Sequence, residues 1–418
     1  MNKLTLIVIF LLWGITTTAQ TAKVDSSSMV TLRIDPESAR GATVSQFFDE
    51  IEYIPLETTS ESLFGKINQL KLTKNNYVIY DFDTKSVLIF NKAGKFVAKI
   101  NATMLKSDEE SKEPTNFFGF RIINIDGQEQ IAISAAKNIF FFDLNGKLIQ
   151  KKLTKDYPVD RTYSFSNANR YAKASHLKID GKDSTYYEIS LFNNGNEIGN
   201  YLPIKRIKGD IYMPGSNTNI SGVYNYGIEN KFFYTSPYHF NIYEITPEKL
   251  SLAYRIILPA ANSLPSDFLT NEIYNGQKMP FLQKNNQLAF GIGDTFKFGN
   301  HLFFKFRSMA LNGSKNNALI YNLKTGELTS IKDLEPDKLS FYLPVTDAGA
   351  YYDYTMNGMH LYSEGYLYTS YSSLAMFTFK EQSTGKNPQY NATLTDYFKT
   401  QSRKSNPVLI RLKPKTAN

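Results

Sequence analysis

Short apolar runs and turn residues recur along this chain in a regular unit. In one copy, the apolar run 88–90 is followed by a turn at Ala93-Gly94 and a second apolar run at 96–98. Runs of this kind bounded by Gly, Asn and Asp are typical of strands joined by tight turns. The aromatic residue of the first run returns about every fifty residues, at Phe90, Phe142, Phe192 and Tyr243. The pattern therefore predicts a repeat architecture built from β-strands.

Six such units account for most of the chain. The first five are expected at about 67–100, 118–153, 164–204, 222–258 and 288–331, each with four short strands. The sixth is less regular, and its strands are expected at about 365–371, 376–379 and, after a polar insertion, 407–413.

Units of this length favour an all-β fold, a six-bladed β-propeller of four-stranded antiparallel blades. A β-sandwich does not produce six equal units, and β-helix repeats are far shorter. A terminal strand standing alone would expose an unpaired edge. We therefore expect Val408 to Leu412 to complete a sheet with N-terminal residues around Ile51 to Ile54, so that the two ends of the chain close the ring.

The first residues have the features of an export signal. Lys3 provides a positive start, residues 4–15 are apolar, and small residues precede an expected cut after Ala19. This predicts a signal peptide at 1–19, a polar N-terminal segment at 20–46 and the propeller at 47–413, with no transmembrane segment after signal removal. The chain contains no Cys, so we expect a protein of the periplasm or the extracellular space that is not a lipoprotein.

The charge balance is basic but evenly distributed. Lys and Arg number 47 against 39 Asp and Glu, a net charge of +8. Lysines such as Lys71, Lys92 and Lys99 stand beside apolar positions, as on the solvent side of strands. A nucleic-acid-binding protein gathers its basic residues on one patch or arm. We expect no nucleic-acid partner.

Both ends of the repeat region resemble a known family. The strings Tyr53-Ile54-Pro55-Leu56-Glu57-Thr58-Thr59 and Asn406-Pro407-Val408-Leu409 resemble the opening and the ending of secreted six-bladed β-propeller proteins of Bacteroidetes bacteria. The likeness covers nearly all of the predicted mature chain. The loop 101–116 departs from it, because it is acidic and lysine-rich where relatives often have Gly and Pro. The resemblance implies an exported propeller and associates it with glycan capture or uptake.

Motifs of common enzymes are absent from the sequence, with no His-Glu-x-x-His, no Gly-x-Ser-x-Gly and no phosphate-binding loop. Gly291-Ile292-Gly293 resembles the start of a dinucleotide fingerprint but lacks the third Gly and a following helix, so we interpret it as a loop. Asp81 and Asp83 fall in an expected turn, where Asp commonly binds its own backbone. We expect no cofactor and no metal, because the His residues lie in different units without ligand spacing: His176, His239, His301 and His360.

The long connections between units are the best candidates for function. Each joins the last strand of one blade to the first of the next, so all share one face, at about 101–117, 205–219, 259–285 and 344–358. Their aromatic and acidic side chains suit stacking on sugars or gripping a peptide, although such rings also pack loops onto blades. The predicted ligand-binding residues are Tyr212, Tyr274, Tyr351, Tyr352 and Asp353.

Two functions remain open at this point. One is an exported module that binds a glycan or a cell-envelope protein at the loop-bearing face without chemistry of its own. The other is a glycan-cleaving hydrolase or lyase. The enzyme would need acids or His within about 10 Å of one another in a pocket. The candidates for such a group are Asp294, Asp347, Asp353, His239 and His301.

Overall fold

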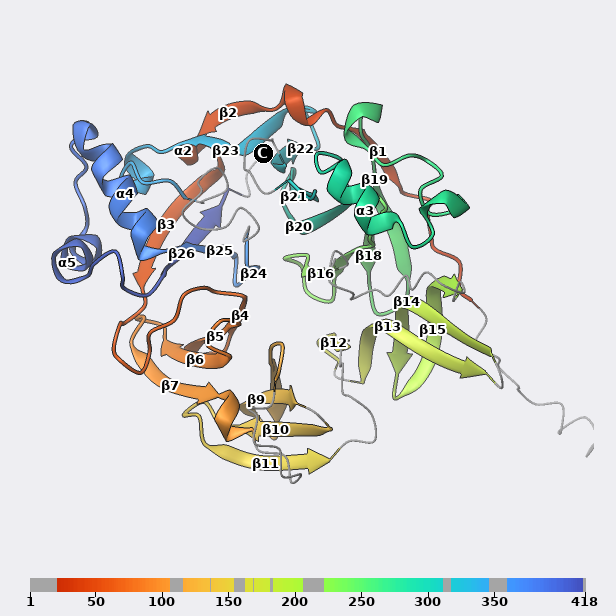
Figure 1. Cartoon of the computed structure of the whole chain (residues 1–418), viewed down its shortest axis with the longest axis horizontal. Helices are drawn as coiled ribbons and strands as arrows, with labels where there is room; N and C mark the ends of the chain where they lie inside the picture. The colour runs from red at the N-terminus through yellow and green to blue at the C-terminus, as the bar shows by residue number, and fades with distance from the viewer. Residues whose placement is uncertain are drawn as a thin grey trace, which may run out of the picture.

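The computed structural model has six β-sheets arranged around one axis (Figure 1). Residues 21–105, 116–135, 137–153, 162–167, 169–180, 183–205, 222–310, 317–345 and 359–415 are described, and the expected signal peptide lies outside them. Four antiparallel strands form the blade in each sheet, with the first strand nearest the axis, and two of the sheets have a fifth, parallel strand at the outer edge. The predicted six-bladed β-propeller is confirmed.

Blades one to three follow the chain order. Blade one consists of β4 (Gln69–Leu72), β5 (Asn76–Asp81), β6 (Ser86–Asn91) and β7 (Phe96–Asn101). Blade two consists of β8 (Arg121–Ile125), β9 (Gln128–Ala135), β10 (Asn138–Phe142) and β11 (Leu148–Leu153). Blade three consists of β12 (Thr162–Ser164), β13 (Arg170–Asp180), β14 (Asp183–Asn193) and β15 (Asn196–Lys205).

Blades four to six combine chain order with strands from the N-terminus. Blade four contains β16 (Gly222–Asn225), β17 (Phe232–Thr235), β18 (Asn241–Ile245) and β19 (Leu250–Ile257). Blade five contains β20 (Gly291–Phe298), β21 (His301–Arg307), β22 (Ala318–Asn322) and β23 (Leu328–Glu335). Blade six contains β24 (Leu361–Ser363), β25 (Tyr366–Tyr371), β26 (Val408–Pro414) and the N-terminal β3 (Phe48–Pro55).

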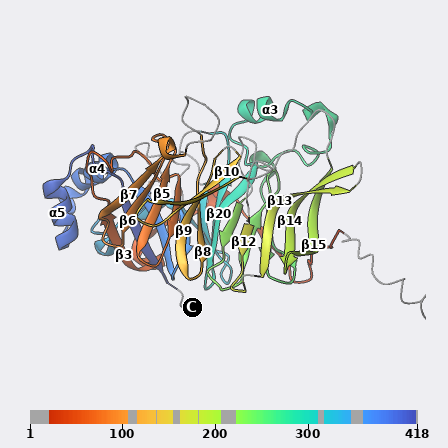
Figure 2. The ribbon, with the colours of Figure 1, turned by 90° about the horizontal axis from the view of Figure 1, so that it is seen from below.

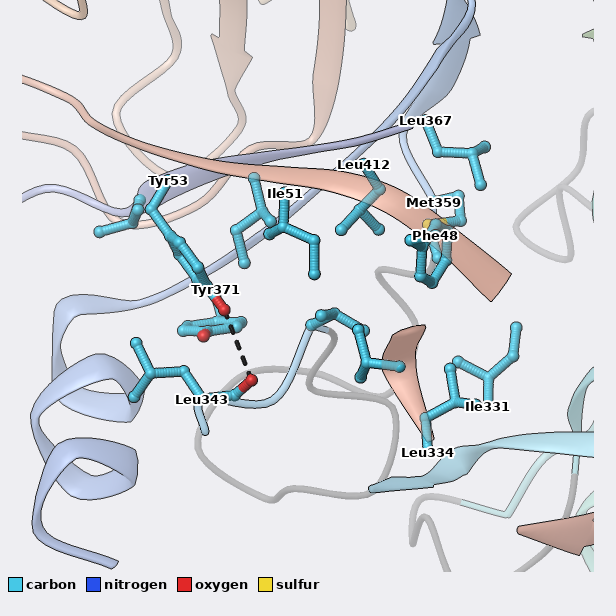
Figure 3. Close-up of a cluster of buried hydrophobic side chains, with 14 of the residues drawn as sticks. Phe48, Ile51, Tyr53, Ile331, Leu334, Leu343, Met359, Leu367, Tyr371 and Leu412 are labelled. Carbon is cyan, nitrogen blue, oxygen red and sulfur yellow. Dashed lines mark hydrogen bonds between the residues drawn. The ribbon is translucent and has the colours of Figure 1, made fainter. Parts of the chain in front are cut away.

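The two ends of the chain close the ring in blade six, as the sequence predicts. In the β26–β3 ladder, Leu409 pairs with Ile54 and Leu412 pairs with Ile51. The Tyr53 hydroxyl donates to the carbonyl oxygen of Leu343 at 3.4 Å, which ties β3 to the connection after blade five (Figure 3). The side chains around this closure form one buried apolar cluster with residues of blade five: Ile51, Tyr53, Leu412, Leu334 and Leu343.

The N-terminal segment before β3 runs along the outer rim of three further blades. Ala22 N–H donates to Asn200 O of blade three at 2.8 Å. Then β1 (Val30–Arg33) adds a parallel fifth strand to β19, and β2 (Arg40–Thr43) does the same to β23. The segment thus covers outer edges that would otherwise expose unpaired backbone groups. The sequence does not predict this pairing, because the partner strands are far away along the chain.

One predicted strand of blade six is wrong. Residues 376–379 lie in the helix α4 (Ser373–Ser383), which begins where the Ser372 side chain accepts a hydrogen bond from Ala375 N–H at 3.1 Å. Ala375, Met376 and Phe379 are its buried apolar residues, and this spacing fits one side of a helix. The polar insertion after it contains a second helix, α5 (Ala392–Thr400). The third strand of the blade is β26 instead.

The remaining helical segments are short. The α-helices are α2 (Val44–Phe47) and α3 (Lys278–Lys284). The 3-10 turns are η1 (Pro36–Ser38), η2 (Ala102–Met104), η3 (Ala260–Asn262), η4 (Glu272–Tyr274), η5 (Lys338–Ser340) and η6 (Thr384–Lys386). In the part of the chain that the structure describes, no helix is long and apolar enough to cross a membrane.

Strand alternation decides which connections share a face. Within each antiparallel blade, the connection from the previous blade and the loop between the second and third strands lie at the same end of the sheet. Figure 2 shows α3, from one of the connections between blades, on this side of the strands. We call it the loop-bearing face. The tight turns after the first and third strands lie on the opposite face.

Candidate functional site

An irregular inner strand in blade five positions an acidic side chain close to the axis. The register between β20 and β21 shifts between Gly293 and Phe296, and Asp294 has a left-handed φ of 47°. Bulges of this kind re-aim side chains and are frequent beside functional sites. The interpretation of Gly291-Ile292-Gly293 as a loop is wrong, since these residues begin β20. A Cβ atom on Gly293 would lie 2.5 Å from Arg307 Nε, so the glycine makes room for the arginine.

Asp294 and Arg307 form a partly buried ion pair. Arg307 Nη2 lies 3.3 Å from Asp294 Oδ1, and the side chains are 22% and 17% exposed. The Asp294 charge raises the pKa of the Arg307 guanidinium. Within the described residues, the buried atoms Asp294 Oδ2 and Arg307 Nε have no hydrogen-bond partner in the protein. Buried polar atoms are nearly always paired, so a half-satisfied pair at this position indicates a place for a ligand or solvent.

Blade four supplies two further polar side chains beside this pair. Burial raises the pKa of Tyr224, which lies on the inner strand β16, and the Arg307 charge opposes that rise. The ring of Tyr224 contacts Phe296 edge-on, with 6.0 Å between the ring centroids. Thr235 Oγ1 donates to the carbonyl oxygen of Ile292 at 2.8 Å, which ties β17 to the start of β20.

Blade six supplies a histidine and a serine. His360 Nε2 lies 2.7 Å from Ser370 Oγ, and His360 N–H donates to the Tyr368 carbonyl oxygen at 2.7 Å. Burial lowers the pKa of His360 to about 4, while the Asp294 charge acts in the opposite direction and Lys66 adds to the lowering. His360 is therefore neutral at pH 7 and offers one ring nitrogen as a donor and one as an acceptor.

Residues from three neighbouring blades thus meet near the loop-bearing end of the axis. Tyr224 lies in the short inner strand β16, Asp294 lies in the first half of β20, and His360 directly precedes the inner strand of blade six. The group offers fixed hydrogen-bond donors and acceptors with little net charge, which suits a hydroxyl-rich ligand better than an ion. We call this group the polar cluster: Tyr224, Thr235, Asp294, Arg307, His360 and Ser370.

Only one of the predicted ligand-binding residues lies in the described part of the chain. Tyr274 ends η4 and packs its ring against Phe268 and Phe281, with centroid distances of 4.9 and 5.1 Å. Its ring thus helps to hold the connection after blade four together, and its ligand role stays a prediction. The others fall outside the described residues, as does the candidate acid Asp347: Tyr212, Tyr351, Tyr352 and Asp353.

The other candidate acids and histidines do not gather at the polar cluster. His301 begins β21 at the opposite face and contacts Phe47, with 5.4 Å between ring centroids. His239 lies in the loop between β17 and β18, and burial lowers its pKa. Asp81 Oδ2 accepts hydrogen bonds from the backbone and side chain of Thr84 at 3.2 and 2.7 Å, as expected of a turn residue. No group of three metal-ligating side chains occurs among the described residues.

The sequence contains a weak signal for the polar cluster. Glycine in a strand marks a bulge or a close backbone approach, and Gly291 and Gly293 directly precede Asp294. Arg307 and His360 have no such local signal, because the fold brings them together from separate blades. Of the three enzyme-site candidates that the structure describes, Asp294, His239 and His301, Asp294 is the one that belongs to the cluster.

The fold and the polar cluster define a six-bladed β-propeller with a candidate binding site at its loop-bearing face. The chain belongs to the family described as Domain of unknown function (DUF4934), whose model matches residues 31–413. No curated protein matches the chain.

Solved structures give further similarity in fold. A Bacteroides fragilis protein designated a candidate exported protein is 13% identical with a TM-score of 0.61, and the match covers 92% of this chain and 100% of that one. A DUF4221-family protein of Bacteroides vulgatus is also 13% identical, with a TM-score of 0.44 and coverage of 88% and 98%. At 13% identity, the likeness to the B. fragilis protein concerns the fold alone.

Proposed function

We propose that this protein is an exported binding module that captures a glycan at its loop-bearing face through the polar cluster. The observation that carries the proposal is the half-satisfied pair of Asp294 and Arg307, with a buried acceptor and a buried donor that lack protein partners. Export is supported by the designation of the structurally similar B. fragilis protein. The periplasm or the cell exterior is the proposed location.

The chemistry of the polar cluster favours a sugar over a simple anion. A sugar hydroxyl both donates and accepts hydrogen bonds, so it can bind a carboxylate oxygen and a guanidinium N–H at once. Asp294 already neutralises Arg307, which weakens the attraction for a free anion. The partly buried ring of Tyr224 adds an apolar face with a polar tip. A cell-envelope protein that carries or transfers the glycan is the second proposed partner.

A glycan-cleaving hydrolase or lyase is the alternative function. It is favoured by the contact between His360 Nε2 and Ser370 Oγ, since a base within hydrogen-bond reach of a hydroxyl is the arrangement of an activated nucleophile. The lowered pKa of His360 argues against it, because a general base works best with a pKa near the working pH. Binding without turnover is therefore the leading proposal.

A glycan-array screen of the mature protein tests the binding proposal. The hits are then titrated with Asp294→Asn, Arg307→Met and the double variant, with Arg403→Met as the control. Arg403 pairs with Glu381 on α4, outside the polar cluster. We expect at least a tenfold loss of affinity in the cluster variants, about 1.4 kcal/mol per factor of ten, and none in the control. If the three cluster variants and the control all bind the glycan as tightly as the wild type, the assignment of the site is overturned.

A turnover assay on the same glycans separates the two functions. A pure binding module releases every hit unchanged. Product formation that disappears in His360→Gln and in Ser370→Ala would instead establish the enzyme. Product formation that disappears in Asp353→Ala would also refute pure binding and would move the chemistry to the connection after blade five.

A further inference from the structure

Two exposed phenylalanine rings stack on each other on the loop-bearing face, away from the polar cluster. Phe82 is 48% exposed and Phe118 is 81% exposed, the largest exposed fraction of any large apolar residue in the described ranges. Their ring centroids lie 6.3 Å apart and their planes differ by 24°. Scattered apolar residues are normal on a surface, but an adjoining pair of exposed aromatic rings indicates an interaction site.

The backbone beside both rings is held by contacts with neighbouring residues. Phe82 lies in the loop between β5 and β6, and its N–H donates to Asn68 Oδ1 at 2.8 Å. Phe118 lies between Phe117, whose buried ring contacts Tyr80 at 5.1 Å, and Phe120. The backbone of Phe120 makes two hydrogen bonds with the side-chain amide of Gln69, at 2.9 and 3.0 Å. A pair fixed in this way loses little conformational freedom when a ligand binds.

Polar groups flank the aromatic pair. Lys85 Nζ donates to Asn116 Oδ1 at 2.6 Å, and Asp83 stands between Phe82 and Lys85 in the loop. A flat apolar face with carboxylate, amide and ammonium groups at its side matches a sugar ring, which has an apolar C–H face and polar hydroxyl edges.

The segment before and at the start of β4 connects the aromatic pair with the polar cluster. Lys66 acts electrostatically on His360 of the polar cluster. Asn68 holds Phe82, and Gln69 holds the backbone beside Phe118. Blade six, which supplies Ser370 to the polar cluster, also packs directly on blade one, since Tyr368 of β25 lies in one buried apolar cluster with Ile79 of β5. The aromatic pair and the blade-six part of the polar cluster therefore lie on neighbouring blades at the loop-bearing face.

We infer that Phe82 and Phe118 form a second subsite, which stacks on a sugar ring of an oligosaccharide bound at the polar cluster. This inference rests on the proposed function and extends it, since it makes the ligand an oligosaccharide long enough to reach from blades four to six to blade one. An oligosaccharide held at the polar cluster must be long enough to reach blade one before it contacts the pair, so the subsite selects for chain length.

A tryptophan placed in the subsite reports on it directly. The single Trp of the sequence, Trp13, lies in the expected signal peptide, so the introduced residue is the one Trp of mature Phe118→Trp and can be excited separately from the tyrosines. Leu63→Trp is the matched control, because Leu63 is 48% exposed, as is Phe82, and lies outside the pair. We expect long oligosaccharides to change the fluorescence of Phe118→Trp, short ones to leave it unchanged, and neither to affect Leu63→Trp.

Calorimetry on an oligosaccharide length series completes the test. Phe82→Ala and Phe118→Ala should lose about tenfold affinity for long chains and none for the shortest binding unit, whereas Arg307→Met should weaken all lengths. If affinity does not depend on oligosaccharide length and is the same in both Phe variants as in the wild type, the subsite is refuted while the proposed function stands. Absence of any glycan binding by the wild type would refute the proposed function itself. If a peptide changes the fluorescence of Phe118→Trp and no sugar does, the aromatic pair is assigned to a protein partner.

Discussion

Two acidic side chains in this propeller differ in how completely the protein satisfies their oxygen atoms. Glu188 of β14 is 5% exposed and both of its oxygens are satisfied, by the Tyr234 hydroxyl and by Ser236 Oγ of blade four, each at 2.9 Å. Asp294 instead pairs with a cation and keeps one oxygen without a protein partner. The Glu188 arrangement joins blades three and four, and both carboxylate oxygens are already occupied by protein donors. The second is incomplete by itself, which is why it is the candidate site.

The largest expected effect comes from removing the satisfied acid. Glu188→Ala removes the buried acceptor of two hydroxyl donors and opens space between blades three and four, so the free energy of unfolding should fall by about 2–4 kcal/mol. Asp294→Asn should cost less, because that side chain is partly exposed. Chemical unfolding at pH 6 measures both. A greater loss for Asp294→Asn would reverse the comparison.

The pH dependence of stability separates Glu188 from His360. Burial raises the pKa of Glu188 to about 7 and lowers that of His360 to about 4. The Glu188 contribution to the free energy of unfolding is complete below pH 4.5 and is lost as the pH rises through 7, by at most about 3 kcal/mol. The His360 contribution is complete above pH 6.5 and is lost as the pH falls through 4, by a similar amount.

These two contributions oppose each other between pH 4.5 and 6.5. Glu188→Gln should therefore lose stability as the pH falls from about 6.5 to about 4, and His360→Gln should lose stability more steeply than the wild type as the pH rises from about 4.5 to about 6.5. Unfolding measured at about pH 5, 6.5 and 8 follows both trends. Parallel pH profiles for the two variants would contradict the assigned pKa directions.

A single methyl group tests the geometry at Asp294. Gly293→Ala places a Cβ atom 2.5 Å from Arg307 Nε, so the guanidinium must move away from its position beside Asp294. We expect about a tenfold loss of glycan affinity with little change in stability, since Gly293 has no left-handed φ. Gly385→Ala is the control, because nothing lies within 4 Å of a Cβ atom there. Unchanged affinity in both would show that the arginine position is unimportant.

The smallest expected effect is at Tyr274. If its ring mainly packs against Phe268 and Phe281, Tyr274→Ala should loosen residues 259–285 locally and leave the midpoint of global unfolding nearly unchanged. Hydrogen exchange of this segment measures the change. Loss of glycan affinity without faster exchange would instead support the ligand role predicted from the sequence.

The sequence predicted the repeated parts of the molecule well. The six units, their strands and the pairing of Val408–Leu412 with residues near Ile51 follow from local apolar runs and turn residues. The prediction of a strand at 376–379 was wrong because a short apolar run with aromatic residues fits either a strand or a buried helix face. The prediction of a loop at 291–293 was wrong because glycines that make room for Arg307 look like turn residues.

By itself, the sequence determined the period, the β character and the closure of the ring, since these depend on residues close together or on an edge that must be paired. Only the tertiary structure decided which polar side chains meet. Asp294, Arg307 and His360 come together because neighbouring blades converge at the axis, and the N-terminal strands β1 and β2 find partners more than two hundred residues away. Such contacts between distant segments arise from packing, which no local pattern of residues records.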